Sequence, residues 1–298
     1  MRRRFVTLDV FTEKRFAGNP LAVVLEPDGL DTAAMQTIAR ELNLSETVFV
    51  FPPADSQNRA QLRIFTPGRE LPFAGHPTVG TAVLLGRIDG GAGEQSIALE
   101  EKVGLVRCRV ESTGADSGRA TFWLPRLPEI TGEASDNATI AAALSISASD
   151  IGAEGWAVQR WSAGNPFTIV PVPSLEVVAK SRPDMAHFER AFGGGFAAPF
   201  VVCRQAAEAG HDFHARMFAP GVGVAEDPAT GSAAAAFAGY LAAHAGYRDG
   251  EHTVLIEQGY EMGRPSVMEL TLDIGDGKLT GASIGGSAVI VMEGTIEA

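Results

Sequence analysis

The chain has 298 residues, 45% of them hydrophobic and 20% charged, which is the balance of a soluble globular protein with an ample core. Its 24 basic and 36 acidic side chains give a net charge of −12, which argues against a nucleic-acid-binding face. Two cysteines provide no disulfide framework, and the basic amino terminus lacks the apolar run of a signal peptide. We therefore expect a cytoplasmic protein, and the length suggests two domains.

The first part of the chain alternates between predicted strands and helices. Apolar and β-branched runs predict strands over residues 5–11, 21–25, 47–51, 61–65, 97–100, 103–110 and 120–124. Asp31 is a good N-cap for a helix in which Met35 and Ile38 fall on one face. Glu46 comes directly before a strongly apolar strand, where a charge is unexpected unless it faces a cleft. A carboxylate there would have a raised pKa and could move a proton, although a solvent-facing glutamate at a strand edge is an alternative.

Two segments predict helices that are apolar on every face. The first covers residues 77–86 and has His76 ahead of it, and the second runs from Asp227 and Pro228 to about residue 244. Asp227 suits an N-cap, and Pro228 suits the first helical position. Such helices must be surrounded by protein, because they are too short to span a bilayer. The first turn of each presents unpaired N–H groups and a positive dipole end, which together form an anion site.

The second half of the chain repeats the plan of the first. The turn Gly18-Asn19-Pro20 returns as Gly164-Asn165-Pro166, and Arg63-Ile64-Phe65-Thr66-Pro67 returns as Arg216-Met217-Phe218-Ala219-Pro220, each about 150 residues later. His76 then falls opposite Asp227. Further strands are expected over 156–159, 167–172, 200–203, 214–218, 253–257, 266–272 and 288–292, with a helix over 184–192. We infer a tandem duplication, with an N-terminal lobe over residues 1–125 and a C-terminal lobe over 126–298.

This pattern predicts an α/β (α+β) fold in which each lobe is a barrel-like sheet wrapped around its own buried helix. We expect the lobes to be pseudo-symmetric, so that both helix N-termini converge on one cleft, the natural place for a ligand. His76 and Asp227 would then approach a small carboxylate-bearing molecule from opposite sides. The other residues expected to hold this molecule are Gly75, Thr230, Gly231 and Ser232.

Five groups of motifs follow one another along nearly the whole chain. They are Asp9-Val10-Phe11 with Gly18-Asn19-Pro20, then Ser45-Glu46-Thr47-Val48-Phe49, then Arg63-Ile64-Phe65-Thr66-Pro67 with Glu70-Leu71-Pro72-Phe73-Ala74-Gly75-His76-Pro77-Thr78, then Asp227-Pro228-Ala229-Thr230-Gly231-Ser232-Ala233, and last Glu257-Gln258-Gly259 with Gly263-Arg264-Pro265-Ser266. Together they resemble the phenazine-biosynthesis PhzF-like family. The resemblance implies a diaminopimelate-epimerase-like fold, an active site between the lobes, an isomerase similar to dihydro-hydroxyanthranilate isomerase, and a homodimer.

The resemblance also implies roles for particular residues. Glu46 occupies the motif of the glutamate that moves a proton between carbon atoms, and His76 and Asp227 match the polar partners of that glutamate. These three are the candidate catalytic residues. The candidate substrate-binding residues are Asn19, Ser45, Gly75, Thr230, Gly231 and Ser232.

The cysteines narrow the chemistry further. Related racemases and epimerases on this fold use two thiols, one on each face of the substrate carbon, but Cys108 and Cys203 lie in predicted strands away from the helix starts. A single carboxylate that acts as base and then as acid favours a proton shift (allylic isomerisation or tautomerisation) over racemisation. Our hypothesis is a cofactor-independent isomerase of a small carboxylate-bearing substrate, without nucleic-acid or membrane partners. The alternative is a non-catalytic small-molecule-binding protein on the same fold.

His211 and His214 are the other side chains that could suggest a metal. Residues three apart on a strand face opposite sides, and no further ligand cluster accompanies this pair in the sequence. We therefore expect no metal site.

Overall fold

The structure, a computed structural model, describes residues 1–90, 93–193 and 197–298. Its residue contacts divide the chain into unit 1, which is Met1–Pro125 with Ile284–Ala298, and unit 2, which is Arg126–Ser283. We expected the carboxyl-terminal residues to belong to the second lobe. They belong to unit 1 instead, because residues 288–297 of the last strand pair antiparallel with the first strand.

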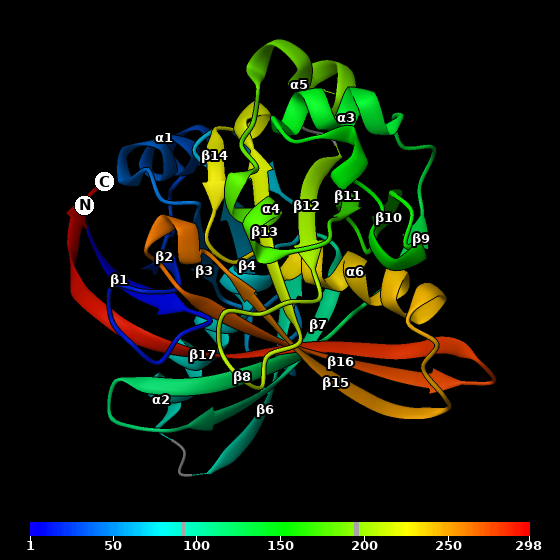
Figure 1. Cartoon of the computed structure of the whole chain (residues 1–298). Helices are drawn as coiled ribbons and strands as arrows, with labels where there is room; N and C mark the ends of the chain where they lie inside the picture. The colour runs from blue at the N-terminus through cyan, green and yellow to red at the C-terminus, as the bar shows by residue number, and fades with distance from the viewer. Residues whose placement is uncertain (91–92, 194–196) are drawn as a thin grey trace. The chain divides into compact units, whose positions relative to one another are not determined.

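Unit 1 is a closed sheet around one helix (Figure 1). Its elements are β1 (Arg2–Val10), β2 (Asn19–Leu25), α1 (Thr32–Leu42), β3 (Glu46–Phe51), β4 (Ala60–Phe65), β5 (Glu70–Leu71), α2 (Gly75–Asp89), β6 (Glu94–Glu101), β7 (Gly104–Ser112), β8 (Ser117–Trp123) and most of β17 (Lys278–Glu297). The order of pairing is β17, β1, β2, β3, β4, β6, β7 and β8, and the pairing of β8 with β17 closes the barrel. The helix α2 packs against β1, β2, β3, β6, β7 and β8, and its residues 75–86 are all buried.

Unit 2 is built in the same way. Its elements are β9 (Glu129–Ile130), α3 (Asn137–Leu144), η1 (Ala148–Asp150), η2 (Ala153–Gly155), β10 (Gln159–Ser162), β11 (Pro166–Pro171), α4 (Leu175–Lys180), α5 (Met185–Phe192), β12 (Ala198–Cys203), β13 (Phe213–Ala219), η3 (Pro220–Val222), β14 (Val224–Asp227), α6 (Gly231–His244), β15 (Gly250–Gln258), η4 (Tyr260–Met262) and β16 (Ser266–Gly275). The helix α6 packs against β10, β11 and β16.

The strand pairings show the repetition directly. In unit 1, β2 is parallel to β3, β3 antiparallel to β4, β4 parallel to β6, and β6 antiparallel to β7. Unit 2 has the same four pairings in the same order: β11 is parallel to β12, β12 antiparallel to β13, β13 parallel to β15, and β15 antiparallel to β16. The expected fold, two similar sheets that each surround a buried helix, is therefore confirmed.

The starts of the two buried helices differ from the expectation. Helix α6 begins at Gly231 with Thr230 as the N-cap, so Asp227 does not cap it, because Asp227 still belongs to β14 and pairs with Met217. Helix α2 begins earlier than expected, at Gly75, so that His76 lies inside its first turn. The repeat therefore preserves the sheets better than the helix starts.

Close packing around α6 gives a first test of this architecture. A Cβ atom at Gly239 would lie 2.5 Å from two ring atoms of Trp161 and 2.9 Å from Cγ of Pro128. We expect Gly239→Val to reduce the free energy of unfolding by about 1–3 kcal/mol, because the added atoms overpack a dense core. Chemical denaturation measures the loss. Ala243→Val, at an exposed position of the same helix, is the matched control and should cost less than about 1 kcal/mol. Equal effects of the two changes would contradict the packing argument.

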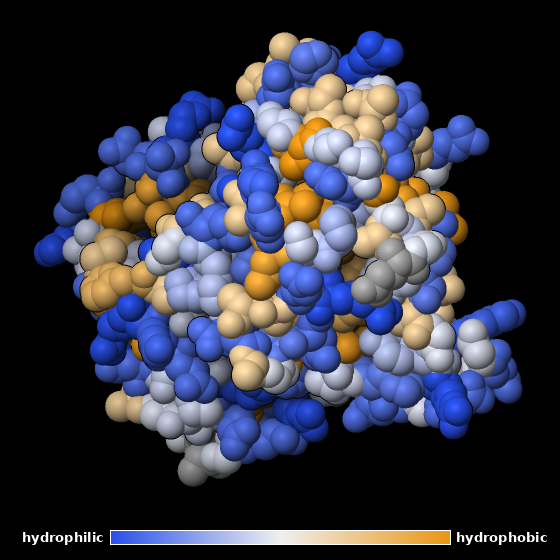
Figure 2. All heavy atoms as spheres, viewed as in Figure 1, coloured by the Kyte–Doolittle hydropathy of each residue, from blue (hydrophilic) through white to orange (hydrophobic). Residues whose placement is uncertain are grey.

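The surface is predominantly hydrophilic on the face shown in Figure 2, with apolar residues interrupting it in separate patches. Within the residues that the structure describes, no helix has both the length and the apolar character needed to cross a membrane.

Candidate active site

Unit 1 brings together three of the predicted site residues. Glu46 is the first residue of β3, His76 lies in the first turn of α2, and Asn19 is the first residue of β2. His76 Nε2 lies 3.4 Å from Glu46 Oε2, a contact longer than a well-formed hydrogen bond. Asn19 Nδ2 lies 3.1 Å from His76 Nδ1. The parallel pairing of β2 with β3 sets Leu21 opposite Glu46 and so holds the two strand starts side by side.

The state of His76 follows from its burial. Its side chain is 3% exposed, and burial lowers the pKa of His76 to about 3. The imidazole is therefore neutral at physiological pH. Because the amide of Asn19 donates to Nδ1, the ring proton sits on Nε2 and points toward the Glu46 carboxylate. The arrangement presents a carboxylate whose neighbour can donate a hydrogen bond but carries no charge.

In unit 2, the predicted residues Asp227 and Thr230 lie around Gln258, for which the sequence suggested no role. Asp227 Oδ2 accepts a hydrogen bond of 2.6 Å from the hydroxyl of Thr230. Gln258, at the end of β15, donates from Nε2 to Asp227 O at 2.6 Å and to Thr230 Oγ1 at 2.9 Å. The Gln258 Oε1 atom accepts from Thr230 N at 3.1 Å. The fully buried amide of Gln258 thus fixes the loop that carries Asp227 into α6.

The remaining predicted residues lie at the starts of the same elements. Ser45 directly precedes β3, Gly75 opens α2, and Gly231 and Ser232 open α6. Gly75 and Gly231 are buried, whereas Ser45 and Ser232 are half-buried. The loop before α6 packs closely against Gly259, because a Cβ atom at Gly259 would lie 2.6 Å from the Pro228 carbonyl oxygen.

The two cysteines do not supply acid–base groups. Both are buried free thiols, and burial raises the pKa of Cys203 to about 11 and that of Cys108 still further from its usual range. Cys203 also lines a hollow in unit 2 together with Trp156, Arg204 and Phe213. None of the predicted site residues lines this hollow, so it is a separate feature of the fold.

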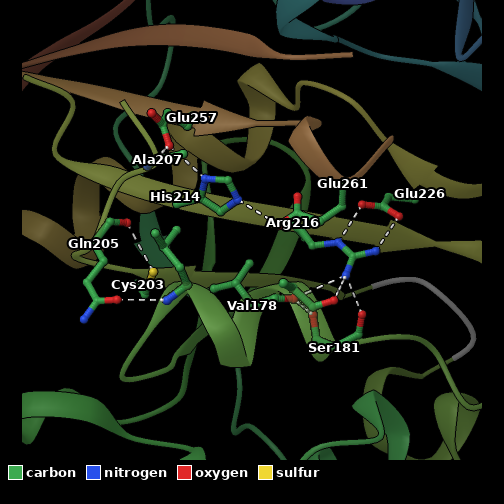
Figure 3. A network of polar contacts seen from close by, with 12 residues as sticks. Val178, Ser181, Cys203, Gln205, Ala207, His214, Arg216, Glu226, Glu257 and Glu261 are labelled. Carbon is green, nitrogen blue, oxygen red and sulfur yellow. Dashed lines mark hydrogen bonds and ion pairs between the residues drawn. The ribbon is translucent and has the colours of Figure 1, made fainter. Parts of the chain in front are cut away.

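The histidine pair of unit 2 does not behave as expected. His211 precedes β13 instead of lying in it, and both His211 Nδ1 and His214 Nδ1 contact the Glu257 carboxylate, at 2.7 and 2.8 Å. His214 Nε2 lies 3.0 Å from Glu261, so that His214 is held between two carboxylates (Figure 3). The expectation that these histidines face opposite sides was wrong, because it assumed one continuous strand. Among the residues described, no group of His, Cys, Asp and Glu could hold a metal ion.

A pair of similar units, each with a sheet around a buried helix, defines a fold class that includes the hydroxyproline epimerase of Agrobacterium vitis. That structure has a TM-score of 0.67 and 13% identity, and the similarity covers 99% of this chain and 91% of the other. The family model described as "Phenazine biosynthesis-like protein" matches residues 8–294. The chain belongs to this family, which confirms the resemblance in the sequence.

Individual relatives support the same assignment. A Mesorhizobium japonicum protein named an uncharacterized isomerase is 48% identical over 99% of this chain and 98% of its own length. The trans-2,3-dihydro-3-hydroxyanthranilate isomerase of Pseudomonas fluorescens is 37% identical over 98% of both chains. The crystal structure of a Bacillus anthracis phenazine biosynthesis protein of the PhzF family has a TM-score of 0.88 at 26% identity, with full coverage of both chains.

Proposed function

We propose that this protein catalyses a proton shift on a small carboxylate-bearing substrate, with Glu46 as the single acid–base group. The observation that carries the proposal is the contact of Glu46 with a neutral, buried His76 beside the first turn of α2. The coarser statement follows from the family and its named relatives: the chain is an isomerase.

In the proposed reaction Glu46 removes a proton from one carbon of the substrate and returns it to another carbon on the same face. A single carboxylate suffices for such a shift, because the same group is base in the first half and acid in the second. The Nε2–H group of His76 faces the Glu46 carboxylate at 3.4 Å and would orient it, and the neutrality of the imidazole keeps it from competing as a second acid. No cofactor enters the proposed reaction. The proposed substrate class is a dihydro-hydroxyanthranilate or another unsaturated cyclic carboxylic acid, because the relative from Pseudomonas fluorescens is named for such a substrate.

Unit 2 supplies the other proposed contacts. We propose that the start of α6, with Gly231, Ser232 and Thr230, holds the acidic group of the substrate, since a helix N-terminus favours an anion. Asp227, whose carboxylate is fixed by Thr230, would orient a polar group of the same molecule. A cytoplasmic location and a homodimer are also proposals, and sedimentation tests the second.

A screen in deuterated buffer tests the proposed function. Cyclic and unsaturated amino or carboxylic acids are incubated with the protein, and mass spectrometry measures deuterium at carbon. Incorporation into one compound would support a carbon-to-carbon proton shift. Ligand binding without any incorporation would instead support the non-catalytic binding protein.

A double-mutant cycle measures the coupling of His76 and Asp227 in turnover. We expect His76→Asn and Asp227→Asn each to lower kcat/KM, and the double variant to lose less than the product of the two losses, because residues that act as a unit are not additive. Steady-state kinetics of the four proteins measure this. Strictly multiplicative losses would mean that the two residues contribute independently.

A further inference from the structure

Glu101 is a buried carboxyl group that the proposed reaction does not use. It is the last residue of β6, is 8% exposed, and approaches the first turn of α2. Its Oε1 atom lies 2.7 Å from the hydroxyl of Thr78. That hydroxyl also lies 2.8 Å from the carbonyl oxygen of Ala74, the N-cap residue of the helix.

The hydrogen atoms available to Thr78 and Glu101 bear on the protonation state of Glu101. The hydroxyl of Thr78 has one hydrogen, which can be donated either to the Ala74 carbonyl or to Glu101 Oε1. Both contacts are hydrogen bonds at the same time only when the carboxyl group is protonated and donates to Thr78 Oγ1. The geometry therefore fits a neutral Glu101 that donates to Thr78, which in turn donates to Ala74.

The surroundings agree with a neutral carboxyl group. Burial raises the pKa of Glu101 to about 8, although a hydrogen bond donated by Thr78 would favour the ionised form. The buried thiol of Cys108 on β7 interacts electrostatically with Glu101, and the neutral His76 lies in the same first turn of α2 as Thr78. The adjacent Lys102 is engaged by Glu70 of β5 at 2.7 Å.

The repeat gives an independent argument. In unit 1, β6 runs parallel to β4 with Glu100 opposite Gln61, and in unit 2, β15 runs parallel to β13 with Glu257 opposite His214. Glu100 accepts the backbone N–H groups of residues 54 and 55, as Glu257 accepts those of residues 207 and 208. Glu101 is therefore the counterpart of Gln258.

The contacts of Gln258 indicate the role of Glu101 at the end of β6. Gln258 is an uncharged side chain of nearly the same shape, and it binds the loop at the start of α6 as Glu101 binds the start of α2. Each unit thus holds the start of its buried helix with a neutral side chain at the end of the equivalent strand.

We propose that Glu101 is a positioning residue that works as a neutral carboxylic acid, equivalent to Gln258, and that its ionisation weakens substrate binding at alkaline pH. The second part rests on the proposed function. When Glu101 loses its proton, the Thr78 hydroxyl turns from Ala74 to the carboxylate, and a negative charge appears beside the positive end of α2. A negatively charged substrate that reacts at Glu46 beside the start of α2 then meets an additional negative charge, so KM rises more than kcat falls.

The first experiment needs no substrate. The folded protein keeps the Glu101 proton that the unfolded chain releases, so this contribution to stability is complete below pH about 4.5 and is lost as pH rises through about 8. Glu101→Gln cannot lose a proton, so we expect its Tm to exceed that of the parent by an amount that grows over this range. The infrared band of a protonated carboxyl group should disappear in the variant. Glu94→Gln, exposed on the same strand, is the control and should change neither.

The second experiment uses the substrate found by the deuterium screen. We expect an alkaline rise in KM for the parent protein, its absence in Glu101→Gln, and a loss at every pH in Glu101→Ala. A pH-independent Tm difference together with an unchanged infrared band would overturn the proposal, even if the protein is active. The proposal's first part would stand if the screen found no substrate, because the stability and infrared results do not depend on turnover.

Discussion

Replacing Glu46 by glutamine is expected to lower turnover by about 10² or more, because general acid–base catalysis of this size is lost with the carboxylate. Glutamine keeps the shape of the side chain, and Glu46 is half-buried at a strand start, so the fold should be retained. The measurement is the rate of deuterium incorporation into the substrate, together with kcat and KM. We expect kcat to fall much more than KM rises, because the carboxylate acts mainly in the transition state.

The matched control is Glu41→Gln on the exposed side of α1. It removes the same charge five positions earlier in the chain and should leave turnover within about twofold, since surface changes of this kind are nearly neutral. Full activity of Glu46→Gln on the true substrate would remove Glu46 from the mechanism. An equal loss in both variants would indicate a general effect of charge.

Much of the fold could be predicted from the sequence, because its patterns are local. Helix α1 begins where Asp31 accepts a hydrogen bond from Ala34 N at 2.8 Å. Of the two residues expected on its inner face, Met35 is buried and Ile38 is half-buried. The two helices without a polar face could be recognised as buried because nothing in their sequence suits water. Short α4 escaped prediction, since its six residues are too few for a periodic pattern.

The start of α6 shows why a local rule can fail. Aspartate followed by proline is a good helix start in isolation, but the pairing of Asp227 with Met217 extends β14 through that position. The helix therefore begins only at Gly231. Tertiary pairing outweighed a capping preference that is worth about 1 kcal/mol.

The candidate site could be predicted only in part. The sequence singled out Glu46, His76 and Asp227, yet the roles of Glu101 and Gln258 depend on contacts between segments far apart in the chain. The motif Glu257-Gln258-Gly259 was the available signal for Gln258. The available signal for Glu101 was the match between this motif and Glu100-Glu101 in the first half of the chain. Neither signal says which backbone group the side chain will meet.

The largest loss of stability is expected from Glu257→Gln. The Glu257 side chain is fully buried and contacts Ala207 N and His214 Nδ1 (Figure 3). It also contacts Glu208 N and His211 Nδ1. An amide accepts with one oxygen only and sets its NH₂ group against donors. We expect the free energy of unfolding to fall by about 3–5 kcal/mol, as when one partner of a buried ion pair is removed. Urea denaturation at constant pH measures it.

The pH dependence of this cluster has a defined sign. Burial alone would lower the pKa of His214, but its hydrogen bonds to Glu261 and Glu257 outweigh burial and raise it. Burial alone would likewise raise the pKa values of Glu257 and Glu261, but hydrogen bonds, those from His214 foremost, lower both. The histidine contribution is complete below pH 6.5 and is lost as pH rises through the raised value. The carboxylate contribution is present above pH 4.5 and is lost as pH falls through the lowered values.

The cluster therefore stabilises unit 2 most between pH 4.5 and 6.5. In Glu257→Gln this maximum should flatten, because the remaining Glu261 leaves His214 with one charged neighbour in place of two. Glu251→Gln, exposed on the same strand β15, is the control and should keep both the stability and the maximum. A Glu257→Gln variant with parental stability across this range would mean that the buried charges are dispensable, and that the hydrophobic packing of β13 and β15 alone holds the strand pair.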